Sequence, residues 1–302
     1  MTEGARSGHP GYDEARAAGV AALDAGRLHE ARERFAAALA VARKAGEPEL
    51  IDRAFCSEAA VAISLGEVDA SLTGLREILV RNRDAENCAL AARNIAHAYE
   101  LRKEYRKSLF YARVARDRAD QAGSEERLAA ANNQIGNALL ALGFFQEAAD
   151  TYRRALAAVP LSRPGWRLVC LSNLGYCEVL EGRFAEGLRR LVAVLREARR
   201  EKLQRLQMIA HIDLCYAHME LERFGSAERH GRAGLELAEW VGEVDWIKNA
   251  LFLLGEVAVL GGDNGHGRDL FTDLQRRFYP GQPYLPDFLV SVDVRQLINL
   301  RA

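Results

Sequence analysis

Four polar side chains recur about every forty residues in the middle of the chain, and their chemistry suits a peptide main chain. In order they are Asn94, Gln134, Asn173 and Asp213. A primary amide donates and accepts hydrogen bonds at once, so it can pair with a backbone N–H and a backbone C=O together. Repeated amides would hold an extended peptide whatever its side chains. We predict that these four residues form a ladder that binds the main chain of a ligand.

Residues beside the ladder would select the ligand's side chains. Positions four residues apart share one face of a helix, and several repeats place polar or aromatic residues at that spacing. The predicted set is Arg93, His97, Asn133, Asn137, Tyr176 and Tyr216. The surface would run from basic through amide-rich to aromatic, which suits a ligand with an acidic end and an apolar end. The alternative is a row of solvated residues without a common partner.

Other motifs suggest chemistry that their context argues against. His211, Cys215 and His218 have helical spacing that could present three ligands to zinc. These positions fall on the packing side of the repeat, and no fourth ligand is evident nearby. The glycine-rich run 261–267 lacks the Lys and Ser/Thr of a phosphate-binding loop, so we interpret it as a turn. No catalytic triad, carboxylate pair or cofactor motif stands out, so we predict no enzymatic activity, metal or cofactor.

Two basic clusters, within 102–107 and 189–205, could contact nucleic acid. Acidic residues flank both clusters, and the net charge of the chain is −1. No global field therefore favours nucleic acid or a membrane surface. We interpret both clusters as solvated outer faces of helices and expect neither partner.

The elements that must position these residues come from a repeat of about forty residues. The first helix of each unit carries an apolar residue followed by a small one, as in Leu254-Gly255. The second carries small, bulky and small residues at spacings of four and three, as in Ala148, Tyr152 and Ala155, which puts all three on one face. Such faces pack large into small. The pattern predicts helix pairs that begin near Tyr12, Asp52, Ala89, Ala129, Leu168, Met208 and Lys248.

The repeat resembles the tetratricopeptide repeat, most completely between Asn133 and Pro160. The resemblance covers residues 12–278, but no repeat has the early Trp of the family, and the spacing exceeds the usual length of about 34. The longer spacing is similar to that of bacterial peptide-sensing regulators and kinesin-light-chain-like adaptors. The resemblance implies an all-α, right-handed α-solenoid of about seven helix-turn-helix repeats, with the ladder on its concave surface and a C-terminal capping segment.

The array predicts three regions. Residues 1–11 are expected to be a disordered lead, residues 12–278 the superhelical domain, and residues 279–302 a cap. The prolines and glycine of 279–286 exclude regular helix at the start of the last region. Solenoid ends need a cap over their exposed core, so we favour a helix over 287–300. The alternative is a tail that docks on another copy of the chain and makes a homo-oligomer.

Composition indicates where the chain works. Its basic residues are mostly arginine and alanine is abundant, a bias typical of GC-rich bacterial genomes. We see no signal peptide, membrane span or CxxC pair, so we predict a cytoplasmic protein whose cysteines pack as small apolar residues. The predicted function is a non-enzymatic scaffold or adaptor that binds an extended protein or peptide segment in its groove. A peptide-responsive sensor acting on a separate effector is the alternative.

Overall fold

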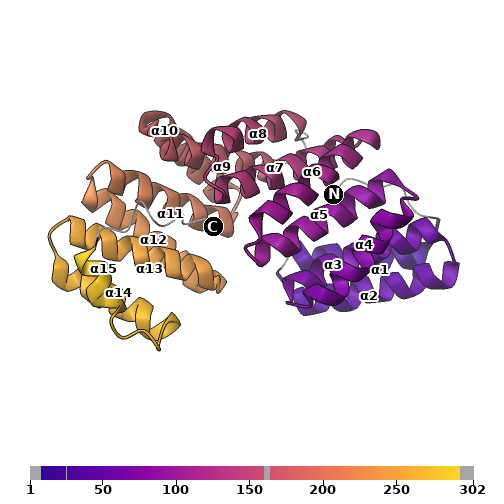
Figure 1. Ribbon diagram of the computed structural model, residues 1–302, viewed down its shortest axis with the longest axis horizontal. Helices are drawn as coiled ribbons and strands as arrows, with labels where there is room; N and C mark the ends of the chain where they lie inside the picture. The colour runs from indigo at the N-terminus through magenta and orange to yellow at the C-terminus, as the bar shows by residue number, and fades with distance from the viewer. Residues whose placement is uncertain (1–7, 25, 160–163, 293–302) are drawn as a thin grey trace. The chain divides into compact units, whose positions relative to one another are not determined.

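A computed structural model describes residues 8–24, 26–159 and 164–292 of the chain (Figure 1). These residues contain fifteen α-helices and no strand, so the all-α prediction is confirmed. The first seven helices are α1 (Pro10–Asp24), α2 (Leu28–Ala45), α3 (Pro48–Ser64), α4 (Val68–Arg81), α5 (Ala85–Leu101), α6 (Tyr105–Gln121) and α7 (Glu125–Ala141). The remaining helices are α8 (Phe145–Ala158), α9 (Pro164–Leu180), α10 (Phe184–Arg200), α11 (Gln204–Glu220), α12 (Phe224–Val241), α13 (Val244–Leu260), α14 (Asn264–Phe278) and α15 (Leu285–Ser291).

The first helices of the seven predicted pairs begin two to four residues earlier than the pattern suggested. Proline explains the difference at two of them, because Pro48 and Pro164 are the first residues of α3 and α9. A proline at this position loses no helical hydrogen bond, and its fixed φ suits the first turn. Each of these prolines therefore begins its helix before the first residue of the periodic pattern.

The turn predicted over 261–267 is confirmed for residues 261–263, which connect α13 and α14, whereas residues 264–267 already form the first turn of α14. Gly262 has φ of 90°, a left-handed conformation that glycine adopts without strain. Asp263 then caps α14, accepting a hydrogen bond from the His266 N–H at 3.0 Å. The run therefore combines a short connection with the start of a helix.

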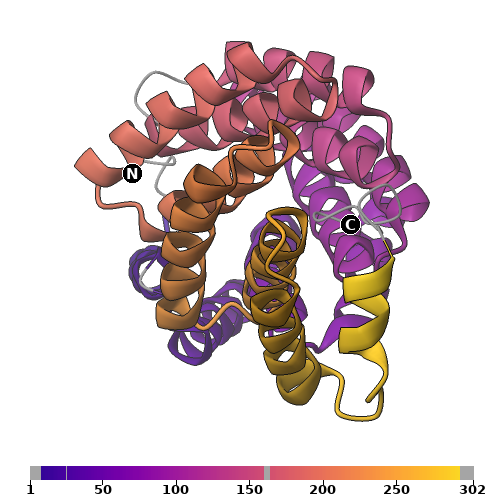
Figure 2. The ribbon, with the colours of Figure 1, turned by 90° about the vertical axis from the view of Figure 1, so that its left-hand side faces the viewer.

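The chain divides into two compact units, residues 1–142 and 143–302. In the first unit, α5 packs against α6 and beside both α3 and α7 (Figure 1). In the second unit, α11 packs against α12 and beside both α9 and α13 (Figure 2). The first helices thus form one layer of each unit and the second helices another.

Small residues let the two layers approach closely, as the repeat predicted. A Cβ added at Gly255 would lie 2.3 Å from a carbon of the Phe271 ring, and one at Gly175 would lie 3.1 Å from Leu191 Cγ. Tyr152 of α8 is fully buried. Close-packed apolar contacts of this kind hold the helix pairs together.

The C-terminal segment caps the last pair with a helix over 285–291. This helix, α15, packs on α14 and α13 and buries Pro286 and Leu289. The predicted helix is confirmed over 287–291, but the exclusion of helix over 279–286 is wrong for Leu285 and Pro286, because a proline fits the first turn of a helix. Residues 293–302 lie outside the described part of the chain. Of the disordered lead predicted over residues 1–11, residues 1–7 also lie outside the described part, and the prediction is wrong for Pro10 and Gly11, which belong to α1.

Candidate functional site

The predicted ladder lies deep in the helix layer. Asn94 of α5 is only 3% exposed, and its Nδ2 donates a hydrogen bond to the Cys56 carbonyl of α3 at 2.7 Å. A side-chain donor that pairs with a helix carbonyl braces two neighbouring first helices. Asn94 therefore already contacts a main chain, and that main chain belongs to the protein itself.

Gln134 of α7 makes the equivalent contact with α5. Its side-chain amide pairs with a C=O and an N–H that are one helical turn apart, donating to the Arg93 carbonyl at 3.3 Å and accepting from the His97 N–H at 2.9 Å. The amide thus binds a donor and an acceptor together, as predicted from its chemistry. The segment that it binds is a helix of the same unit.

The two ladder residues of the second unit are buried as well. Asn173 of α9 is 8% exposed and Asp213 of α11 is 2% exposed. All four ladder residues are buried, whereas five of the six flanking residues are half-buried and the sixth, Tyr176, is buried as well. The ladder's role in ligand binding stays a prediction, and the structure assigns Asn94 and Gln134 a role in stacking helices.

The flanking residues of the first unit lie on a more open face of α5 and α7. Arg93, His97, Asn133 and Asn137 are all half-buried, and each pair is one helical turn apart. Asn137 Nδ2 donates to Glu100 Oε1 at 3.4 Å, and His97 Nδ1 lies 3.8 Å from the other oxygen of Glu100. We call this face, formed by these four residues with Glu86, Glu100 and Arg127, the α5–α7 strip.

Sequence reasoning missed the ion pairs at one end of the strip. Glu86 of α5 receives two hydrogen bonds from Arg127 of α7, at 2.8 and 2.6 Å, and one from Arg53 of α3 at 3.0 Å. Burial alone would raise the pKa of the Glu86 carboxyl, but the two arginines outweigh it and the pKa is lowered. One feature of the sequence could have indicated these ion pairs: Glu86 lies seven residues before Arg93 and therefore on the same helical face.

Arg93 is the cation of the strip that has no counter-ion in place. Within the described residues its guanidinium makes no hydrogen bond or ion pair. Burial lowers its pKa, and the nearby charge of Arg127 lowers it further, while Glu126 acts in the opposite sense. A desolvated guanidinium beside a second arginine attracts an anion, and carboxylates match its geometry.

The aromatic end of the predicted surface lies in the second unit. The rings of Tyr176 on α9 and Tyr216 on α11 pack edge to face, with centroids 6.0 Å apart. Tyr176 is 2% exposed, whereas Tyr216 is half-buried. The predicted pair does come together, but only Tyr216 has a sizeable exposed surface.

The zinc motif belongs instead to a histidine cluster between α11 and α12. His211 and His218 of α11 meet His230 of α12, which sequence spacing did not indicate. The Nδ1 atoms of His211 and His230 are 3.0 Å apart, and Arg199 of α10 lies 3.1 Å from His211 Nε2. Burial lowers the pKa of both His211 and His230 to about 4. A neighbouring ring lowers each pKa further, His230 for His211 and His218 for His230, and so do nearby arginines. Among the described residues, no group of three or more His, Cys, Asp or Glu is placed to hold a metal ion.

The remaining sequence predictions concern membranes and thiols. None of the helices in the described ranges is both long and apolar enough to span a bilayer. All five cysteines are buried, as predicted. Burial raises the pKa of Cys56 and Cys215 to about 12 and that of Cys170 to about 11, so these thiols are protonated at neutral pH.

Comparison with known proteins shows which proteins share this architecture. No family model matches the chain. A stretch of 174 residues is 21% identical to the human "Intraflagellar transport protein 88 homolog", covering 57% of this chain and 20% of that protein. The chain thus matches about a fifth of that relative's length.

Solved structures match much more of the chain. The quorum sensor NprR from B. thuringiensis, in its apo form, superposes with a TM-score of 0.70 and 13% identity, covering 95% of this chain and 82% of that one. NprR in complex with its cognate peptide NprX gives 0.68 and 13%, covering 96% and 83%. A tetratricopeptide repeat protein from Parabacteroides merdae gives 0.57 and 16%, covering 93% and 98%. Together with the all-helical repeat architecture, these matches show that the chain has the fold of the tetratricopeptide repeat proteins.

Proposed function

We propose that the chain is a non-enzymatic binding protein that holds a peptide or protein segment on its first-helix face, with an acidic group of the ligand at Arg93. The observation that carries this proposal is a partly desolvated guanidinium without a counter-ion in the described structure. Partial burial of a charge is costly unless an opposite charge accompanies it. A ligand carboxylate would supply that charge.

The surroundings of Arg93 favour a carboxylate from outside the protein. Arg53 and Arg127 share Glu86, so their charges are already opposed. Glu100 faces His97 and Asn137 and lies about two helical turns beyond Arg93. Arg93 lies between these two groups with its charge unopposed by a contact.

Half-buried amides beside Arg93 suit the rest of such a ligand. Asn133 and Asn137 of α7 lie on the same strip, and each carries a donor and an acceptor for a peptide main chain. NprR, which shares this fold, binds its cognate peptide NprX. A cytoplasmic, bacterial adaptor that binds short acidic segments is the function that we infer from these features.

Peptide selection tests this proposal. We would select binders from a phage-displayed library of random twelve-residue peptides and measure the best by calorimetry. We expect selected peptides to share an acidic residue or a required C-terminal carboxylate. Arg93→Gln should weaken their binding by about 10-fold or more, as expected for loss of a charge-assisted contact. Arg113→Gln is the matched control, because Arg113 is exposed on α6, a second helix. Selected peptides that bind wild type and Arg93→Gln equally well would refute the proposal.

One observation favours the sensor alternative as well. The chain divides into two compact units between Leu142 and Gly143, within the fourth helix pair of the repeat. Relative motion is the default expectation for separate compact units of one chain. A ligand that preferred one arrangement would then change the shape presented to a separate effector.

A further inference from the structure

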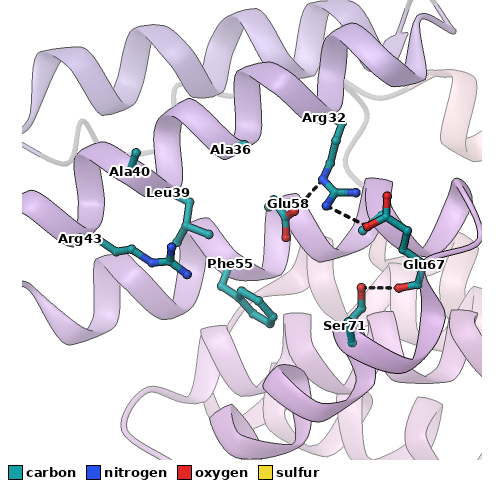
Figure 3. A pocket seen from close by; sticks show the side chains of 11 residues that line it. Arg32, Ala36, Leu39, Ala40, Arg43, Phe55, Glu58, Glu67 and Ser71 are labelled. Atoms are coloured by element: carbon teal, nitrogen blue, oxygen red, sulfur yellow. Dashed lines mark hydrogen bonds and ion pairs between the residues drawn. The ribbon is translucent and has the colours of Figure 1, made fainter.

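A cavity of 340 Å³ lies between α2, α3 and α4 of the first unit, away from the α5–α7 strip (Figure 3). On α3 it is lined by Phe55, Glu58 and Ala62. At about 100° per residue, these side chains project from the opposite side of α3 to Arg53, which pairs with Glu86 of the strip. The cavity is therefore a separate feature, on the second-helix side of the unit.

Small residues create this space. Ala36 and Ala40 of α2, with Ala62 of α3 and Ala70 of α4, line the cavity. The Phe55 ring packs against α4 at Gly74, where there is no room for a side chain. A Cβ added at Gly74 would lie 2.3 Å from the ring. Leu39 and this ring supply the larger apolar walls. The volume lies in the range of small-molecule sites, and six of the eleven lining residues are apolar while five are polar or charged.

The charged residues at the two sides of the cavity differ in their pairing. Arg32 Nε donates to Glu58 at 2.6 Å, and its Nη2 lies 3.0 Å from Glu67, so its charge is opposed. Arg43 is exposed and forms no hydrogen bond or ion pair within the described ranges. Figure 3 shows its side chain extending from α2 toward Leu39 and Phe55. The cavity thus combines apolar walls with one cation available at its edge.

We propose that this cavity binds an aromatic group that carries a carboxylate. The aromatic group would pack against Leu39, Phe55 and the alanines, and the carboxylate would pair with the Arg43 guanidinium. Two sources share this chemistry, a free aromatic acid and the C-terminal aromatic residue of a peptide. The site is independent of the function proposed for the α5–α7 strip.

Titration with small probes tests the chemistry. N-acetyl-L-phenylalanine and N-acetyl-L-phenylalaninamide differ only in the carboxylate, and binding would be followed by NMR chemical shifts of the full chain. We expect a Kd on the order of 0.1–1 mM for the acid, as for a ligand of this size. The amide should bind at least about 5-fold more weakly, because it cannot form the ion pair. Equal affinity for acid and amide, or no binding of the acid, would overturn the proposal.

Paired variants of α2 assign the binding to this cavity. Ala36→Leu fills the space and should weaken the acid about 10-fold or more, whereas Ala37→Leu, at an exposed residue of α2 outside the lining, should not. Arg43→Gln should abolish the preference for acid over amide. Arg34→Gln is its control, since Arg34 is exposed on the opposite side of α2. Binding that survives Ala36→Leu or keeps its acid preference in Arg43→Gln contradicts the assignment.

A third pair of probes separates the two sources. A tetrapeptide ending in phenylalanine with a free C-terminus is compared with the same peptide amidated. Tighter binding of the free-acid peptide than of N-acetyl-L-phenylalanine supports a peptide terminus as the occupant, and the reverse supports a small acid. Arg93→Gln, which tests the other site, should leave all of these affinities unchanged, so failure of one proposal is distinguishable from failure of the other.

Discussion

At the scale of single residues, the recurring amides act first on the protein's own backbone. Asn94 is buried and donates to the Cys56 carbonyl of the preceding first helix. Gln134 contacts the Arg93 carbonyl and the His97 N–H in the same way. The half-buried residues beside them are better placed to meet a ligand, because their side chains keep exposed surface.

This division predicts opposite effects for neighbouring amides. Asn94→Ala should lower the free energy of unfolding by about 1–2 kcal/mol, since it removes a buried hydrogen bond and leaves a small void. Asn137→Ala, at a half-buried residue of the strip, should change stability by less than about 0.5 kcal/mol and weaken the binding of peptides selected on the wild type. Urea denaturation and calorimetry measure the two effects. The division is wrong if Asn94→Ala is as stable as wild type.

The histidine cluster predicts that acid weakens the fold. The pKa of His211 and His230 is about 4 in the folded chain, below the ordinary value of about 6.5. The unfolded state therefore binds more protons between these values, so stability is full above pH 6.5 and falls as the pH drops toward 4. We expect a loss on the order of 2–3 kcal/mol between pH 6.5 and 4.5.

A variant at this cluster separates its contribution from that of other acid-sensitive groups. His230→Leu removes one of the facing rings, so the fall in stability between pH 6.5 and 4.5 should become shallower. His29→Leu, at an exposed residue of α2, should leave the slope unchanged. Denaturant midpoints measured across this pH range give both slopes. Parallel curves for wild type and His230→Leu would show that the cluster does not control the acid response.

At the scale of elements, pairs of helices depend on glycine at their closest points. Gly255 of α13 faces the Phe271 ring of α14, which is fully buried. The same arrangement recurs where Gly19 of α1 meets Phe35 of α2. A ring on the second helix thus fills the space that a missing side chain leaves on the first.

The glycine contact predicts a size-dependent rescue. Gly255→Ala should lower the free energy of unfolding by about 1–3 kcal/mol, because the added Cβ overlaps the ring and tight cores resist overpacking. The loss caused by Gly255→Ala should be smaller in a chain that also carries Phe271→Leu, when that double variant is compared with Phe271→Leu alone. Gly225→Ala is the control, since no neighbouring atom lies within 4 Å of the added Cβ. Thermal unfolding of the four variants decides the matter, and additive losses would exclude the proposed contact.

At the scale of the whole molecule, the helical repeat continues across the boundary between the two compact units. The helix pairs follow one another from Pro10 to Phe278, yet the contacts divide the chain after Leu142. A repeat array is stabilised mainly by contacts between neighbours, and each of the two units is compact by itself. The adaptor and sensor hypotheses differ in whether a ligand changes the arrangement of these units.

Small-angle scattering distinguishes the two hypotheses. Saturation with a peptide selected on the wild type should change the radius of gyration by more than about 1 Å if ligand binding alters the angle between the units. A rigid adaptor should give superimposable curves with and without peptide. The Arg93→Gln variant, at the same peptide concentration, is the control for changes unrelated to binding at the strip.

The sequence by itself determined the helices, their pairing and the packing layer. Periodic small and bulky residues, such as Ala148, Tyr152 and Ala155, specify these features because contacts between adjacent repeats are local. It also identified Arg93, His97, Asn133 and Asn137 as neighbours on one face, since spacing of four implies adjacency on a helix.

The tertiary structure decided which polar residues are available. Spacing alone could not show that Asn94 turns to the Cys56 carbonyl, because the depth of a side chain depends on how closely two helices approach. It could not join His230 to His211, or Glu86 to Arg53 and Arg127, because those residues lie on different helices. The cavity beside Arg43 likewise exists only where α2, α3 and α4 meet. A repeating sequence specifies contacts within and between repeats, whereas a binding site depends on the space that those contacts leave open.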